Sequence, residues 1–274
     1  MSMTWRSDAP PPVVERAPGH WRRLLWRGGR ILAVIGAGLL LTLLLRLPER
    51  TLHGMQRPWT QPVTVWVMGR VVAILGLDLT LEGRPMTGPG AVVANHVSWL
   101  DIFVLNARKR VYFVSKAEVA GWPGIGFLAR LVGTIFIRRD PREARAQTAL
   151  LAARLAAGHR LLFFPEGSST DGLRVLPFRS TLFEALRGLG PQTRVQPVTL
   201  VYEAPPGTDP RFYGWWGDME FGAHLLQVLG APRQGRVRVI CHAPLGVADF
   251  PDRKALALAC ERAVRAGLPP AAAP

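Results

Sequence analysis

The sequence predicts an α/β domain in which helices flank a central, mostly parallel sheet, preceded by an N-terminal helical hairpin that associates with a membrane. From Ala91 onward, short unbroken apolar runs alternate with segments of helical periodicity. Strands without polar alternation are expected where helices cover both faces of a sheet. The expected strands are Ala91–Ala94, Val111–Ser115, Thr134–Ile137, Leu161–Phe164, Val195–Val201 and Val237–Cys241. The expected helices are Trp99–Asn106, Ile125–Leu131, Arg142–Ala157, Thr181–Leu189 and Arg253–Ala266.

The first eighty residues have the composition of a membrane-surface segment. Residues 1–20 contain prolines and lack apolar periodicity, so we expect a flexible tail. Trp21–Arg27 is aromatic and basic, which suits a lipid interface, and it leads into the apolar run Ile31–Leu45. That run is shorter than the roughly 20 residues that cross a bilayer core. The second apolar stretch, Val63–Leu79, is interrupted by Arg70. We therefore expect a helical hairpin that dips into one leaflet, or a single span.

Two other interpretations of the apolar stretches stay open. A secretory signal is weakly supported, because the first run begins about thirty residues in and no small-residue cleavage site follows it. Helices buried in a soluble core would also give such stretches. The patterns divide the chain into a tail over residues 1–20, a membrane-associated helical segment over 21–80, an α/β domain over 81–268 and a Pro/Ala tail over 269–274.

Composition narrows the class of protein further. The chain has 274 residues, of which 49% are hydrophobic, so it can bury a sizeable core and is not a disordered chain. The only cysteines, Cys241 and Cys260, are far apart in sequence, which excludes a disulfide scaffold and a cysteine zinc cluster and favours a reducing compartment. Lys and Arg outnumber Asp and Glu by 34 to 19, a net charge of +15. A membrane surface explains this excess better than nucleic acid, because no basic stripe interleaved with aromatic residues is present.

A His-x4-Asp pair follows the first expected strand. His96 lies in the loop after the strand, Ser98 is placed to cap the next helix, and Asp101 lies in its first turns. Five residues along an ideal helix separate two side chains by about 140°. The pair therefore meets only if the histidine lies outside the helix and folds back over its first turn. There the carboxylate can accept the Nδ1 proton and leave Nε2 to take a proton from a hydroxyl. The start of the helix would supply amide donors for an oxyanion or a phosphate. A purely structural histidine is the alternative.

A second polar segment follows the expected strand Leu161–Phe164. Over residues 163–172 the sequence reads Phe-Phe-Pro-Glu-Gly-Ser-Ser-Thr-Asp-Gly, a carboxylate followed by a turn rich in amides and hydroxyls. Such a loop can bind a polar headgroup, although an ordinary strand-to-loop turn has a similar composition. The segment is neither a hydrolase nucleophile elbow nor a P-loop, because it lacks both Gly-x-Ser-x-Gly and Gly-Lys-Ser/Thr.

Four segments, taken in order, resemble the lysophospholipid acyltransferase family, of which 1-acylglycerol-3-phosphate acyltransferases are typical members. Asn95–Asp101 matches the family's catalytic His-x4-Asp block, and Gly133–Arg139 looks like its second block. Phe164–Gly167 matches the third block, an acceptor-binding loop, and Val195–Val198 is similar to the proline-containing fourth. One block alone would be weak evidence, but four in order at family-like spacing are specific. The resemblance implies a glycerolipid acyltransferase domain over residues 81–268.

The resemblance also implies a mechanism. His96 would be the base that deprotonates a lysolipid hydroxyl, and Asp101 would orient it. The resulting oxygen would attack the thioester of an acyl carrier protein or coenzyme A, with no metal, no other cofactor and no covalent enzyme intermediate. An apolar groove would hold the acyl chain, and the N-terminal helices would lift the acceptor from the membrane lipids. The residues expected to bind substrate are Asn95, Ser98, Arg139, Glu166, Gly167, Ser168, Ser169, Thr170, Arg174 and Pro197.

One departure from the family pattern bears on the acceptor. Phosphate-acceptor members usually carry arginine after Glu-Gly-Thr, whereas this chain has Ser168 and Ser169. A charge-assisted phosphate contact is therefore missing from its expected place, unless Arg174 or Arg179 replaces it. The stretch Ser168–Phe183 resembles the branch that acylates lyso-ornithine lipid, an aminolipid without phosphate. We therefore favour lyso-ornithine lipid slightly over 1-acylglycerol-3-phosphate, whose acylation makes phosphatidic acid.

Functions of two other classes stay open. A non-catalytic membrane-binding protein would explain the N-terminal segment but gives His96 and Asp101 no role. A lipid hydrolase would need a nucleophile, for which Ser98 is the nearest candidate. For an acyltransferase we expect the cytoplasmic membrane, with the active site facing the cytoplasm where acyl donors are made, and no nucleic-acid partner.

Overall fold

The computed structural model describes residues 4–12, 16–88, 90–122, 125–138, 142–187, 189–190 and 192–269. Its strands form one mixed sheet. The strands are β1 (Asp78–Gly83), β2 (Gly90–Ala94), β3 (Tyr112–Lys116), β4 (Ile135–Ile137), β5 (Arg160–Phe163), β6 (Arg194–Glu203), β7 (Arg236–Cys241) and β8 (Leu245–Gly246). The α-helices are α1 (His20–His53), α2 (Thr60–Leu75), α3 (Leu100–Asn106), α4 (Ile125–Leu131), α5 (Ala144–Ala156), α6 (Glu184–Arg187), α7 (Phe221–Gly230) and α8 (Arg253–Ala266). Short 3₁₀ turns are η1 (Ala117–Gly121), η2 (Ser180–Phe183) and η3 (Val247–Asp249).

Most neighbouring strands are parallel, as the sequence predicts. The order is β1-β7-β6-β2-β5-β3-β4, with β8 pairing β6 off this path. β2 is parallel to both of its neighbours, β5 and β6, whereas β6 is antiparallel to β7 and β8. The carboxyl end of β2 therefore opens between two strands in the middle of the sheet. In open α/β sheets, such positions are where loops bind ligands.

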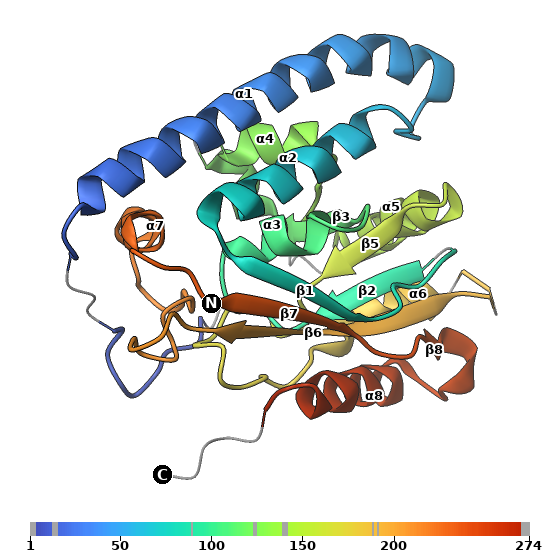
Figure 1. Cartoon of the computed structure of the whole chain (residues 1–274). Coiled ribbons are helices and arrows are strands. Elements are labelled where there is room, and N and C mark those ends of the chain that lie inside the picture. Colours follow the sequence, from blue (N-terminus) through green and yellow to red (C-terminus); the bar gives the residue numbers. More distant parts are fainter. Residues whose placement is uncertain are drawn as a thin grey trace.

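Helices cover both faces of the sheet (Figure 1). In β2, Val92 and Ala94 face a core shared with α2 and α3, whereas Ala91 and Val93 face a second core shared with α5, α6 and α8. Successive residues of a strand point to opposite faces, so a strand buried on both sides needs apolar residues throughout. This explains why the central strands could be predicted as unbroken apolar runs.

The predicted hairpin consists of α1 and α2, and α2 lies between α1 and the sheet (Figure 1). Val71, Val72 and Leu75 of α2 are buried in the core of the domain. α1 packs closely on α2 at Gly38, where an added Cβ would lie 2.2 Å from a methyl carbon of Val67. The hairpin is thus an integral part of the α/β domain and not a separate appendage.

A buried carboxylate fixes the turn of the hairpin. Glu49 of α1 is fully buried and accepts hydrogen bonds from the backbone N–H groups of Trp59 and Thr60, at 2.7 and 2.9 Å, and from the Thr60 hydroxyl at 2.6 Å. Arg46 forms an ion pair with the same carboxylate. These donors belong to the first residues of α2, whose amides lack helical partners. They lower the pKa of Glu49 against the opposing effect of its burial.

The outer surface of α1 is apolar. Leu40, Leu44 and Leu47 are each at least 60% exposed. In the part of the chain that the structure describes, α1 is the one helix long and apolar enough to cross a membrane by length and composition, and α2 is a shorter apolar helix. The helix has 34 residues, so the run expected over Ile31–Leu45 was too short at both ends.

Three expectations need correction. The second apolar helix does not extend to Leu79, because Gly76, at a φ of 82°, ends α2 and the edge strand β1 begins two residues later. Helix α7 was not predicted, and the expected helix Thr181–Leu189 is divided into η2 and α6 within its described residues. Finally, the tail expected over residues 1–20 makes defined contacts within residues 4–12, and α1 already begins at His20.

Candidate active site

The predicted histidine–aspartate pair forms at the carboxyl end of β2. The Nδ1 atom of His96 lies 2.8 Å from Oδ2 of Asp101. His96 lies in the loop before α3 and Asp101 lies in the first turn of that helix, which is the fold-back geometry that the spacing requires. The Asp101 side chain is fully buried, and the His96 side chain is 23% exposed. The buried carboxylate of Asp101 thus orients the ring of His96, which remains partly exposed to solvent.

Three further donors fix the Asp101 carboxylate. Oδ2 accepts the backbone N–H groups of Val97 and Ser98 at 2.8 and 3.1 Å, and Oδ1 accepts the hydroxyl of Tyr202 at 2.9 Å. Tyr202 is a β6 residue that the sequence analysis missed. Burial, and then the charge of Asp101, raise the pKa of Tyr202 well above its usual value, so its phenol stays protonated and donates.

The ring of His96 is fixed on one face as well as at one edge. It stacks on Phe164 with the ring centroids 4.1 Å apart and the planes 10° from parallel. With Nδ1 bonded to the carboxylate, Nε2 carries the lone pair in the neutral ring. Nε2 makes no hydrogen bond to any described residue. In that form of the ring, the geometry leaves Nε2 able to accept a proton from a bound hydroxyl.

One expectation for the start of α3 is wrong. The Ser98 side chain does not cap the helix, and its buried hydroxyl makes no hydrogen bond to a described residue. The amides of Val97 and Ser98 are taken by Asp101, so they do not face an oxyanion or a phosphate. Ser98 is fully buried and is not hydrogen-bonded to His96, which argues against the hydrolase interpretation that needed Ser98 as nucleophile.

The loop after β5 is hydrogen-bonded directly to His96. Glu166 is buried and accepts the backbone N–H of His96 at 2.6 Å with one oxygen and that of Leu176 at 2.7 Å with the other. The backbone N–H of Thr170 donates to the carbonyl of His96 at 2.9 Å. Burial raises the pKa of Glu166 to about 8, although both backbone bonds oppose this shift. In this structure Glu166 therefore joins the two loops, and its oxygens are not directed at open space.

The hydroxyls of the same loop have partners within the protein. Ser169 donates to the carbonyl of Trp215, Ser168 donates to the carbonyl of Ser169, and the Thr170 hydroxyl contacts the carbonyl of Arg174 at 3.3 Å. Gly167 has a φ of 74°, which lets the chain turn there without strain. The loop expected to bind the acceptor is consequently rigid, and its backbone lies next to His96.

The arginines near the site differ in their ion pairs and in their exposure. Arg174 forms a two-point ion pair with the buried carboxylate of Asp171, through Nε at 3.2 Å and Nη2 at 2.9 Å. Arg179 is exposed, and its backbone N–H donates to the carbonyl of Pro165. Arg139, the expected headgroup ligand, lies outside the described residues. Its neighbour Arg138 is exposed and pairs with Glu143.

Asn95 and Pro197, both expected at the substrate, lie within the sheet. The side chain of Asn95 donates to the carbonyl of Leu200 at 3.0 Å and accepts its N–H at 2.7 Å, so it joins the end of β2 to β6. Pro197 is in register with Val93 of β2 and sits where the antiparallel partner of β6 changes from β8 to β7. A residue without an N–H is tolerated at such an interruption.

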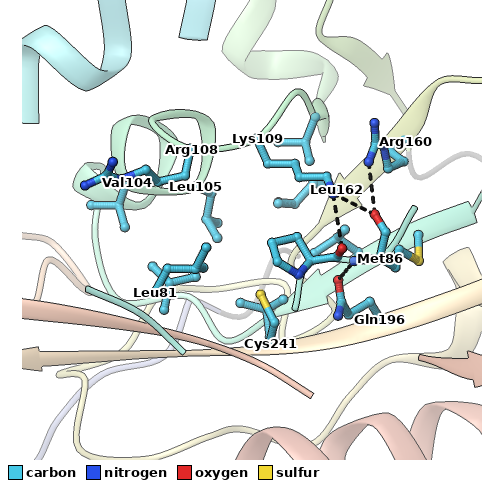
Figure 2. Close-up of a pocket in the computed structure, with 15 residues that line it drawn as sticks. Leu81, Met86, Val104, Leu105, Arg108, Lys109, Arg160, Leu162, Gln196 and Cys241 are labelled. Carbon is cyan, nitrogen blue, oxygen red and sulfur yellow. Dashed lines mark hydrogen bonds between the residues drawn. The ribbon is translucent and has the colours of Figure 1, made fainter. Parts of the chain in front are cut away.

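Figure 2 shows a small cavity, and neither His96 nor Asp101 is among the residues that line it. It lies under α3 near the amino ends of β2 and β5, has a volume of about 40 Å³, and is lined mainly by apolar side chains. Lys109 and Arg160 both donate to the carbonyl of Met86, which closes one end of the cavity. Burial lowers the pKa of Lys109. The volume is room for a few water molecules and not for an acyl chain. Among the residues that the structure describes, no three His, Cys, Asp or Glu side chains are grouped to hold a metal ion.

Tyr202, Trp215 and the stacking role of Phe164 were not predicted from the sequence. The backbone N–H of Trp215 donates to the carbonyl of Val97 at 2.9 Å, so the segment before α7 supports the His96 loop. These residues come from β5, β6 and a distant loop. The two strands that flank β2 both carry an aromatic residue at their carboxyl end, and this pattern indicates contacts with the His96 loop. It can be recognised only when the order of the strands in the sheet is known.

The chain is similar over nearly its full length to known acyltransferases. A profile of the acyltransferase family matches residues 79–201. The chain is 59% identical to a lyso-ornithine lipid O-acyltransferase from Rhodobacter capsulatus over 266 residues, which is 96% of each chain. It is 36% identical to a lyso-ornithine lipid O-acyltransferase from Pseudomonas aeruginosa, over 92% of this chain and 96% of the relative. A 1-acyl-sn-glycerol-3-phosphate acyltransferase from Neisseria meningitidis is 33% identical over 73% of this chain and 78% of the relative.

The fold also has a counterpart among solved structures. The crystal structure of the 1-acyl-sn-glycerophosphate acyltransferase from Thermotoga maritima matches with a TM-score of 0.64, over 93% of this chain and 96% of that chain. The two sequences are 20% identical, so this match speaks for the fold alone. It covers the N-terminal helices as well as the sheet, because almost the whole of both chains is included.

Proposed function

The chain belongs to the acyltransferase family and is a lysolipid acyltransferase, and we propose that it transfers a fatty acyl group from an acyl-carrier-protein or coenzyme A thioester to the hydroxyl of lyso-ornithine lipid. The observation that carries the proposal is the partly exposed histidine whose Nδ1 is held by a fully buried carboxylate. Such a pair supplies a general base without a protein nucleophile. Among the described residues no serine, threonine or cysteine side chain is hydrogen-bonded to the ring of His96, which favours acyl transfer between two substrates over hydrolysis through a covalent enzyme intermediate.

In the proposed reaction, Nε2 of His96 takes the proton of the acceptor hydroxyl as the oxygen attacks the thioester carbonyl. An ester C–O bond forms, the C–S bond breaks, and the departing sulfur takes the proton back from His96. Asp101 stabilises the imidazolium that exists between these two proton transfers. The scheme needs no resident metal or cofactor, since the donor thioester is a co-substrate.

Two observations favour an acceptor without a phosphomonoester. The position at which phosphate-acceptor relatives carry arginine is Ser169, whose hydroxyl is bonded to Trp215. Arg174, the nearest replacement, has its charge balanced by Asp171 through two of its nitrogens. A dianionic phosphate gains most from an unpaired guanidinium in a two-point contact, and Arg174 does not offer one. The names of the two lyso-ornithine lipid O-acyltransferases above support the same acceptor.

We also propose that the enzyme works at the cytoplasmic membrane with its active site facing the cytoplasm. The exposed leucines of α1 and the aromatic and basic residues at its start give the hairpin an apolar face flanked by cations. The structure is compatible with either a monotopic hairpin or a single span. Because α2 is buried in the domain, α1 is the helix that would enter the lipid.

A lysolipid panel tests the proposed acceptor and donor. Purified full-length protein is given lyso-ornithine lipid, 1-acylglycerol-3-phosphate or 1-acylglycerophosphoethanolamine, each with acyl carrier protein and coenzyme A thioesters, and the ester products are identified by mass spectrometry. We expect the diacylated ornithine lipid as the main product, formed at least about 10²-fold more slowly by His96→Ala. A clear preference for 1-acylglycerol-3-phosphate would overturn the acceptor assignment and leave acyl transfer intact. Release of free fatty acid without ester product would overturn both.

A further inference from the structure

Residues 4–12, which we call the N-terminal strap, lie against the loop that follows β5. The backbone N–H of Trp5 donates to the hydroxyl of Ser168 at 3.0 Å. The Trp5 ring contacts the ring of Trp216 at a centroid distance of 6.1 Å. The guanidinium of Arg174 lies over the Trp5 ring at 5.2 Å. One residue of the strap therefore touches three residues that are 163 or more positions away in sequence.

The residues that Trp5 touches adjoin two segments that are hydrogen-bonded to the loop containing His96. Ser168 and Arg174 bracket Thr170, whose backbone N–H is bonded to the carbonyl of His96. Trp216 adjoins Trp215, whose backbone N–H is bonded to the carbonyl of Val97. A displacement of the strap would thus act on both segments that support the histidine.

Arg174 is held by two different kinds of contact. Asp171 takes its Nε and one terminal nitrogen in the plane of the guanidinium, and Trp5 covers a face of that plane. The other terminal nitrogen, Nη1, has no hydrogen bond to a described residue. The Arg174 side chain is 53% exposed, so this nitrogen can donate to a ligand. A charge already balanced by Asp171 suits a singly charged group, such as the carboxylate of an amino-acid headgroup, better than a dianionic phosphate.

We propose that Trp5 is a positioning residue for the acceptor: the N-terminal strap holds Ser168 and Arg174 so that the free nitrogen of Arg174 meets the carboxylate of the lysolipid headgroup. This inference rests on the proposed function, since it takes an aminolipid as the acceptor. The strap is held elsewhere by exposed contacts, an ion pair between Arg6 and Asp218 and a hydrogen bond from Arg211 to the carbonyl of Pro10. Such exposed contacts contribute little energy, so Trp5 is the anchor of the strap.

The test compares full-length variants in steady-state assays in which donor and acceptor are varied separately. In Trp5→Ala we expect the KM for the acceptor to rise roughly three- to tenfold, the range expected for the loss of one partly exposed cation–π contact and one aromatic pair. The KM for the donor and the melting temperature should stay near the wild-type values. Trp5→Phe, which keeps an aromatic face, should restore most of the acceptor affinity. Arg6→Ala is the matched control on the same strap and should behave as wild type.

A double-mutant cycle tests whether Trp5 acts through Arg174. In an Arg174→Ala background, Trp5→Ala should have little further effect on the acceptor KM. Fully additive effects would overturn this link. An unchanged acceptor KM in folded Trp5→Ala, or equal rises in both KM values with a lower melting temperature, would overturn the proposal. A fall in acceptor KM would show instead that the strap blocks the site.

The assay uses the lysolipid that the wild-type enzyme acylates fastest, so the two proposals fail in different places. An error in the acceptor assignment appears as a different preferred lysolipid for the wild-type protein, and this would also contradict the carboxylate contact. An error in the role of the strap appears in the comparison of Trp5→Ala with wild type, as one of the contrary outcomes named above, and leaves the preferred lysolipid of the wild-type protein unchanged.

Discussion

Replacing Asp101 with Asn isolates the electrostatic part of the proposed mechanism. The amide can keep its oxygen toward Nδ1 of His96 and the N–H groups of Val97 and Ser98, and turn its NH₂ group toward Tyr202, whose hydroxyl can rotate to accept. The hydrogen-bond framework therefore survives, and the negative charge is lost. We expect a folded protein, because the change preserves shape and most of the bonds.

The expected effect on turnover follows from the charge. Two unit charges about 4 Å apart interact by about 4 kcal/mol at an effective dielectric constant near 20. Asp101 exerts this attraction on His96 only after the histidine has taken the substrate proton. Each 1.36 kcal/mol of transition-state energy is about a factor of ten in rate, so turnover should fall by roughly 10³.

The measurement is the initial rate of ester formation, followed by mass spectrometry, with circular dichroism and thermal melting to establish folding. Tyr202→Phe is the matched control, since it removes one hydrogen bond to the carboxylate and leaves the charge; we expect it to lose about tenfold or less. His96→Ala should lose about 10²–10⁴. A folded Asp101→Asn enzyme with wild-type turnover would refute the base mechanism.

Three further predictions concern stability and membrane binding. Burial lowers the pKa of His224 to about 4 from 6.5, so the stability that its neutral ring contributes is present above pH 6.5 and lost as the pH falls toward 4. The melting temperature of His224→Phe should accordingly fall less over this range than that of wild type, and equal slopes would contradict the assignment. Leu44→Gln combined with Leu47→Gln should weaken co-sedimentation with liposomes by roughly tenfold or more without lowering the melting temperature, because both side chains are exposed. Asn95→Leu should lower the free energy of unfolding in urea by about 1–3 kcal/mol, because the N–H and carbonyl of Leu200 lose their partner.

The parts of this protein that the sequence predicts well are those fixed by local patterns. The central strands are unbroken apolar runs because both faces of the sheet are buried, and they are found within a residue or two of their predicted places. The edge strand β1 has partners only on one side, and its residues are mostly exposed, so it lacks this signal. The amphipathic helix α7 has ten residues, too few for its periodicity to stand out.

The candidate site likewise contains residues that a local sequence pattern identifies and residues that it does not. His96 and Asp101 are five residues apart, so a local motif could identify both. Tyr202 and Trp5 reach the site from positions 101 and 163 residues away from their partners, and nothing near them in sequence indicates those contacts. Glu166 and Asn95 were predicted to bind substrate, and the structural contacts that they make were not predicted. Both make their hydrogen bonds to backbone groups of neighbouring segments, which only the assembled sheet brings within reach.

The N-terminal helix is coupled to the catalytic end of the sheet by specific contacts. Arg23 of α1 donates to the carbonyl of Gly230 at the end of α7, and Arg27 donates to the carbonyls of Leu229 and Ala231. These carbonyls lack helical partners, so the two arginines satisfy the end of the helix. Burial lowers the pKa of Arg27, as expected for a cation enclosed between two helices.

The coupling continues from α7 into the site. His224 of α7 accepts the indole N–H of Trp99 at 2.9 Å, and Trp99 directly precedes α3, which carries Asp101. If α1 enters the lipid, its contacts with α7 and the bond from Trp99 to His224 would set the distance between the membrane and the loop that contains His96. For the same reason, deletion of residues 1–80 is not a selective test of membrane binding, because it removes the buried helix α2 and the first residues of β1. Substitutions on the exposed face of α1 separate the effect on membrane binding from the effect on the fold. They change the contact with lipid and leave the hydrogen bonds to α7 intact.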